Sequence, residues 1–149
     1  MAPPIHVKAV VGLLNAIVIA AGVRNVLVPG TPIPIPEDDV FQAHFHGKTG
    51  SDQKMAFVFQ LLGAFFLLAA VAKLIATFGN AEGTFLRQKL FLAFGALDLV
   101  VAAIVFQYDA LPRSVLGGFA ALHLLEGAAF LEDALFRARP VKGATKKKK

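Results

Sequence analysis

Hydrophobic residues form four long stretches, and the segments between them carry most of the charges, prolines and turn-forming residues. A membrane-spanning helix needs about 17 to 25 mainly apolar residues. Four stretches have this length: 7–28, 55–78, 89–106 and 115–136. Only a helix satisfies its own backbone amides within one segment in lipid. The pattern therefore predicts an all-α integral membrane protein, with a four-helix bundle formed by residues 1–137.

Glycine recurs inside these stretches, where it would weaken a helix in water. In a membrane, small residues instead let two helices approach closely. The glycines therefore predict a compact bundle. They are Gly22, Gly63, Gly95, Gly117, Gly118 and Gly127.

The connections between the stretches differ in length and composition. In the first, 29–54, the run TPIPIPEDD alternates proline with apolar residues, which favours extended backbone, and HFHGKTGSD is rich in turn residues. The second, 79–88, is short, and the third, around 108–113, is shorter still. Residues 138–149 are polar and basic, and they are predicted to be a disordered tail.

The lysines and arginines near the helix ends predict the orientation. Four spans place the N-terminus, the second connection and the tail on one side. Ten basic residues lie there: Lys8, Arg87, Lys89, Arg137, Arg139, Lys142, Lys146, Lys147, Lys148 and Lys149. The other side has three: Lys48, Lys54 and Arg113. Basic residues favour the cytoplasm, so both termini are predicted to be cytoplasmic and the loop 29–54 lumenal.

Composition narrows the classes of function. Only 17% of the residues are charged, whereas soluble domains have about 25%. The absence of cysteine excludes disulfides, thiolate metal sites and cysteine nucleophiles. The net charge of +5 is concentrated in the tail, which favours anionic lipid over nucleic acid. The first apolar run could be a signal peptide cleaved near Gly22, but apolar character resumes after Arg24, which favours an uncleaved helix.

Polar residues inside the predicted spans are the candidates for chemistry. Asp98 and Glu126 lie near the centres of the third and fourth spans, and His123 shares a helix face with Glu126. A charge at mid-helix costs about 2.5–3.5 kcal/mol, so these residues need partners. The remaining candidates are Asn15 and Gln60, together with Arg24 and Lys73, which lie nearer the span ends and can extend to the headgroups.

Three interpretations of these residues remain open. Di-metal helical bundles use a Glu-x-x-His order with further glutamates on other helices, whereas here the order is His-x-x-Glu and it occurs once. The favoured interpretation is interhelical bonding, with Asp98 and Glu126 paired to Lys73, Arg24, His123 or backbone groups. A proton or ion pathway is the third. No catalytic residue, metal or cofactor is predicted.

Two motifs of the first loop are weak. His44 and His46 would share one face of a strand, but two histidines without a third ligand favour a solvated loop over a metal site. Lys48 in HGKTG lacks the glycine-rich start of a phosphate-binding loop.

The tail carries a candidate localisation signal. Lys146 and Lys147 stand fourth and third from the C-terminus, the spacing of the dilysine signal that retrieves membrane proteins to the endoplasmic reticulum. The alternative is a polybasic segment attracted to anionic lipid by about 1 kcal/mol per lysine.

The second span carries a family resemblance. Gln60-Leu-Leu-Gly-Ala-Phe-Phe66, followed by an apolar run ending at Lys73, resembles the Arg-Thr-Phe-Gly-x-Trp-Thr segment of the ergosterol biosynthetic protein 28 family. Gln60 and Phe65 stand where the family has arginine and tryptophan. The resemblance implies a non-enzymatic endoplasmic reticulum scaffold whose partners are sterol C-4 demethylation enzymes.

Three functions follow as hypotheses. The first is a scaffold or assembly protein of the endoplasmic reticulum that contacts membrane lipid and other membrane proteins, in sterol or lipid synthesis. The second is an accessory subunit of a respiratory or photosynthetic complex in a mitochondrial or plastid membrane. The third is a small transporter or membrane enzyme that uses Asp98, His123 and Glu126.

Overall fold

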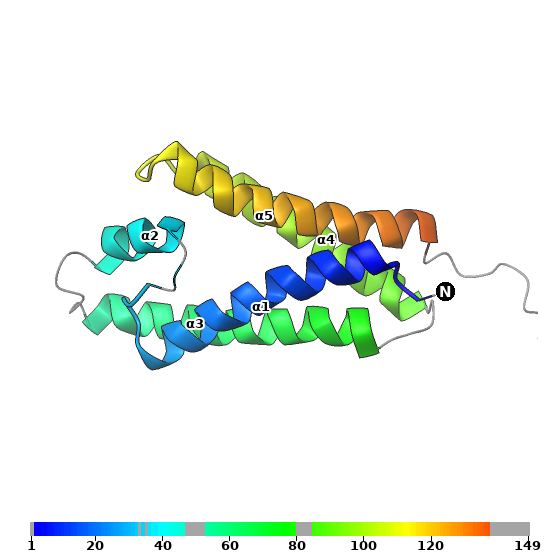
Figure 1. The fold of residues 1–149 in the computed structure, drawn as a ribbon, viewed down its shortest axis with the longest axis horizontal. Coiled ribbons are helices and arrows are strands. Elements are labelled where there is room, and N and C mark those ends of the chain that lie inside the picture. Colours follow the sequence, from blue (N-terminus) through cyan, green and yellow to red (C-terminus); the bar gives the residue numbers. More distant parts are fainter. Residues whose placement is uncertain (1, 33, 35, 47–52, 80–84, 138–149) are drawn as a thin grey trace, which may run out of the picture.

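The computed structural model describes residues 2–32, 34, 36–46, 53–79 and 85–137. The elements are α1 (Ile5–Leu27), α2 (Pro36–His46), α3 (Gln53–Leu74), η1 (Ile75–Gly79), α4 (Phe85–Gln107), α5 (Arg113–Glu132) and η2 (Asp133–Arg137). The π-helical turns η1 and η2 continue α3 and α5. The predicted all-α fold is confirmed (Figure 1).

Within the described residues, four helical segments are long and apolar enough to cross a membrane: Ile5–Leu27, Lys54–Gly79, Phe85–Gln107 and Arg113–Arg137. They contain the predicted stretches, apart from Val28, and extend beyond most of their ends. The largest difference is at α4, because Arg87 and Gln88 were placed in a connection and instead belong to the helix. Gln88 donates from Nε2 to the carbonyl of Ala134 at 3.0 Å, and Arg87 pairs with Asp133. These tertiary partners allow polar residues into the helix.

The prediction of extended backbone and turns was wrong for Pro36–His46, which form α2. Proline fits the first turn of a helix, since its fixed φ is helical and its missing N–H would be unpaired there anyway. The acidic residues that follow it also suit the positive end of the helix dipole. Farther along, the ring of Phe45 stacks on Tyr108 and packs near Phe59. The proline of the first turn and the aromatic packing together favour the helix.

The spans form two antiparallel pairs, α1 with α3 and α4 with α5, and α1 joins the pairs through α5 (Figure 1). Helix α2 contacts α3 and α5 at one end of the bundle, here called the α2 end. The start of α1 and the end of η2 lie at the opposite end, here called the tail end.

Each pair crosses where glycines face each other, as close approach requires. A Cβ on Gly63 would lie 2.7 Å from the carbonyl oxygen of Gly22, and one on Gly95 would lie 3.1 Å from that of Gly127. Gly117 differs, since a Cβ there would meet nothing within 4 Å. The crossings therefore depend on particular glycines.

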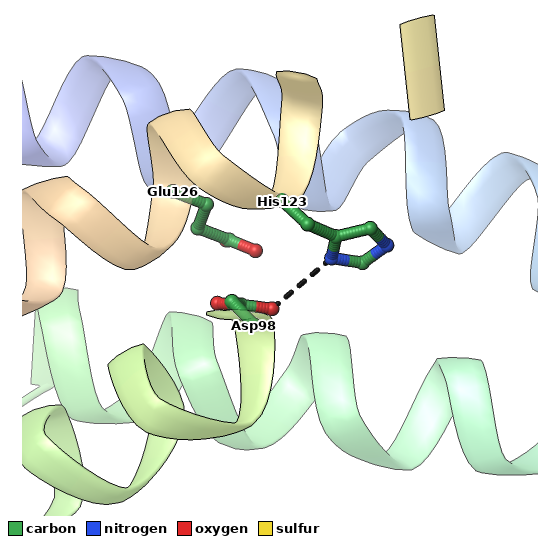
Figure 2. A group of neighbouring side chains, drawn as sticks. All are labelled: Asp98, His123 and Glu126. Carbon is green, nitrogen blue, oxygen red and sulfur yellow. Dashed lines mark hydrogen bonds and ion pairs between the residues drawn. The ribbon is translucent and has the colours of Figure 1, made fainter. Parts of the chain in front are cut away.

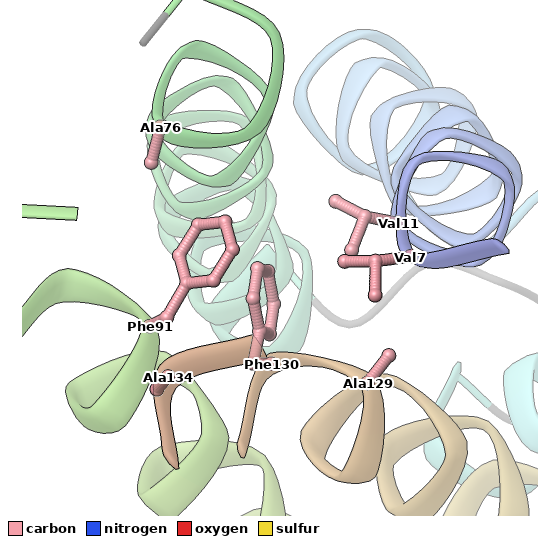
Figure 3. Close-up of a cluster of buried hydrophobic side chains, with 7 residues drawn as sticks. All are labelled: Val7, Val11, Ala76, Phe91, Ala129, Phe130 and Ala134. Carbon is pink, nitrogen blue, oxygen red and sulfur yellow. The ribbon is translucent and has the colours of Figure 1, made fainter. Parts of the chain in front are cut away.

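The hydrophobic core lies toward the tail end (Figure 3). It consists of Val7, Val11, Ala76, Phe91, Ala129, Phe130 and Ala134. The rings of Phe91 and Phe130 meet edge to face, with centroids 4.8 Å apart. Outside the bundle, large side chains such as Phe65, Leu68 and Ile104 are exposed. Such an apolar outer surface is what a lipid environment requires.

Candidate functional site: a buried polar network

Lys73 lies at the centre of the polar residues inside the bundle. Its Nζ is 2.7 and 2.9 Å from the two carboxylate oxygens of Asp98 and 2.6 Å from Oε2 of Glu126. All three ammonium donors thus have charged acceptors. Extension of Lys73 to the headgroups, expected from its position near a span end, is therefore not observed: the residue is only 6% exposed. Attraction to two carboxylates away from water turns the side chain inward.

Asn15 and His123 complete the arrangement. Asn15 donates from Nδ2 to Oε1 of Glu126 and to the carbonyl of Val11, the latter at 2.8 Å. His123 Nδ1 lies 3.2 Å from Oδ1 of Asp98, and the His123 and Glu126 side chains extend from α5 toward Asp98 on α4 (Figure 2). We call Asn15, Lys73, Asp98, His123 and Glu126 the central network. It joins all four spans.

Arg24 and Gln60 lie outside the central network. Arg24 donates from Nη1 to the carbonyl of Thr31 at 2.9 Å, and Gln60 donates from Nε2 to that of Val26 at 3.3 Å. Both bind backbone near the end of α1. Arg24, one of the partners considered for Asp98 and Glu126, therefore does not contact them.

The charges of the central network do not balance. With both carboxyl groups ionised, Asp98 and Glu126 bring two negative charges, and protonated Lys73 brings one positive charge. With a neutral imidazole at His123 the network carries a net charge of −1.

A metal site was one of the open interpretations. Asp98, His123 and Glu126 present ligand atoms within 4.8 Å of one another, a grouping that a metal ion can use. The Lys73 ammonium, however, already contacts both carboxylates. It acts as a tethered cation in this cluster.

A second buried ion pair was missed in the sequence. Arg87 Nη2 lies 3.2 Å from Oδ2 of Asp133, and both side chains are fully buried. Arg87 had been counted among the charges at the cytoplasmic helix ends. Asp133 follows Glu126 by seven residues, which places both on one face of a helix; this spacing was the available signal.

The loop histidines lie on α2, so the strand geometry assumed for them was wrong. His44 Nε2 is 2.8 Å from the hydroxyl of Tyr108, which links α2 to the connection between α4 and α5. The side chain of His46 lies outside the described residues, as do Lys48, Lys146 and Lys147.

Comparison of the chain with protein-family models, curated proteins and solved structures gives no match. The resemblance to the ergosterol biosynthetic protein 28 family therefore stays a prediction.

Proposed function

We propose that the chain is a non-enzymatic scaffold or assembly protein of the endoplasmic reticulum membrane, with both termini in the cytoplasm. The observation that carries the proposal is the central network, whose polar groups bind one another. Lys73 bonds to both carboxylates, Asn15 to Glu126 and His123 to Asp98. Such bonds tie four helices into one body, which is a structural use of polar residues in lipid.

A scaffold acts through its surface, and this surface suits other membrane proteins. Along α3, Phe57, Phe65 and Leu68 are exposed and apolar. Helices in lipid associate by close packing, so side chains of this kind can contact lipid or a neighbouring span. The surface favours partners that are themselves membrane proteins.

The nature of the partners follows from the sequence. The resemblance in the second span favours membrane-bound enzymes of sterol or lipid synthesis. The basic residues near the helix ends favour a cytoplasmic tail, on which Lys146 and Lys147 can be read as a retrieval signal. Together these features favour the endoplasmic reticulum over mitochondria or plastids.

Affinity purification in mild detergent tests the proposal. The tagged chain should be isolated from sealed microsomes with two or more membrane-bound enzymes of lipid synthesis, in amounts comparable to its own. A four-span protein of similar expression serves as the control for trapped membrane. Co-isolation with subunits of a respiratory or photosynthetic complex would instead support the accessory-subunit hypothesis. Isolation of the chain without any partner protein would overturn the scaffold proposal.

A further inference from the structure

The spans carry polar and apolar residues in matching layers. Asn15, Lys73, Asp98 and Glu126 each belong to a different span. One or two turns nearer the tail end, the same spans contribute Val11, Ala76, Phe91 and Phe130, which are at most 3% exposed. These four residues form an apolar layer directly beside the central network.

The two aromatic rings occupy the middle of the apolar layer. Figure 3 shows Phe91 and Phe130 pointing into the space between the helices. Lys73 Nζ lies 5.7 Å from the ring centroid of Phe130, and Arg87 Cζ lies 5.8 Å from that of Phe91. The pair of rings thus separates the central network from the Arg87–Asp133 ion pair.

One member of the central network is more exposed than the others. The His123 side chain is 30% exposed, whereas those of Lys73, Asp98 and Glu126 are at most 8% exposed. Asn15 is buried. His123 precedes Glu126 by one turn on α5, in the direction of the α2 end. The most accessible member of the network is therefore on the side away from the apolar layer.

The excess negative charge of the central network favours the binding of a proton. An uncompensated charge inside a protein is destabilising, and histidine is the side chain best suited to gain or lose a proton near neutral pH. The charged groups around His123 are Asp98 from α4, Lys73 from α3 and Glu126 on α5 itself, while α1 supplies the neutral Asn15. One added proton makes the sum zero.

We propose that the central network is a proton-binding site that opens to the α2 end and is closed toward the tail end by the layer of Phe91 and Phe130. A hydronium ion gives its proton to the ring nitrogen of His123 that does not face Asp98 and leaves as water, and the resulting imidazolium pairs with the carboxylate of Asp98. Lys73 and His123 then balance the two carboxylates. The site is a binding site for one proton, independent of whether the chain also organises partners.

Accessibility to a thiol reagent provides the first test. Because the chain has no native cysteine, only the introduced cysteine can react. His123→Cys and Val11→Cys are each placed in sealed vesicles of known orientation and treated with a membrane-impermeant thiol reagent from either side. The Cys at 123 should react from the α2 side only, and the Cys at 11 from neither side. Thr31→Cys, at an exposed position of the α2 end, controls for reagent activity. Reaction of the Cys at 123 from the tail side, or from neither side, overturns the proposal.

Proton flux provides the second test. The parent protein, or the double variant with Phe91→Ala and Phe130→Ala, is reconstituted into vesicles that contain a pH-sensitive dye. A potassium gradient with valinomycin then sets up a membrane potential that drives protons across the membrane. The variant should conduct above the parent, and adding His123→Gln should return the flux to the parental level. Phe94→Ala is the matched control, since this ring also packs on Phe130, at 5.5 Å, but lines an apolar groove between η1 and α4.

Folding is checked by size-exclusion chromatography and helix content. If the double alanine variant does not fold, Phe91→Leu is combined with Val11→Cys, and the Cys should then react from the α2 side. A folded variant that neither conducts nor exposes position 11 overturns the proposal.

Discussion

Lys73→Met removes the ammonium that contacts both buried carboxylates, while keeping a long apolar side chain. The parent network carries one positive and two negative charges. The variant leaves two negative charges in the middle of the bundle without the lysine cation between them. We therefore expect this to be the most destabilising single charge removal in the central network.

Two estimates set the magnitude. Lys73 makes three bonds of 2.6–2.9 Å, and at about 0.6 kcal/mol for each interhelical bond in a membrane their loss costs about 2 kcal/mol. Removing one partner of a buried ion pair costs about 3–5 kcal/mol, because the other charge stays buried. Asp98→Asn and Glu126→Gln differ from this, since each removes a negative charge from a network that has one in excess. Each should cost less than about 1 kcal/mol, as expected for neutral interhelical bonds.

The assay is unfolding in detergent followed by circular dichroism, with the variants measured side by side. The triple variant Lys73→Met, Asp98→Asn, Glu126→Gln removes all three charges and should recover much of the stability lost in Lys73→Met. If Lys73→Met costs no more than Asp98→Asn, or if the triple variant is the least stable, the bridging role of Lys73 is refuted.

Three further predictions concern the crossings, the topology and the tail. Gly63→Ala should weaken the crossing of α1 and α3, because its Cβ would lie 2.7 Å from a carbonyl oxygen, whereas Gly117→Ala should not destabilise; thermal stability in detergent compares them. In sealed microsomes, Thr31→Cys should be labelled only after the membrane is opened, and labelling from the cytosolic side would invert the topology. Replacing Lys146 and Lys147 with serine should move the protein to later membranes in fluorescence microscopy, while the same change at the last two lysines should not.

Hydropathy was enough to predict the helical class and the approximate spans, because apolar stretches of this length have few alternatives in lipid. The helix α2 was not predicted, since the proline-rich pattern of its first turn also suits extended backbone. Its stability rests on the contacts of Phe45 with Tyr108 and Phe59. Such contacts between distant segments are not visible in a local pattern.

For the polar residues, too, the sequence indicated their positions but not their contacts with distant segments. Their positions in the spans indicated that Asp98, His123 and Glu126 need partners, but not which ones. Lys73 and Arg24 looked alike from their places near span ends, yet Lys73 faces two carboxylates and Arg24 donates to the carbonyl of Thr31, beyond the end of α1. Arg87 looked like a surface charge because its partner Asp133 is 46 residues later. Rotation of each helix about its axis decides these pairings.

The scaffold proposal is tested most directly by asking whether the partners stay together without this chain. Enzymes found with it are tagged, isolated from cells that lack the chain, and compared with cells in which the parent is restored. The scaffold proposal predicts that the enzymes separate from one another in its absence, keep their individual activities, and reassemble when the chain returns. Enzymes that remain associated without the chain would contradict it.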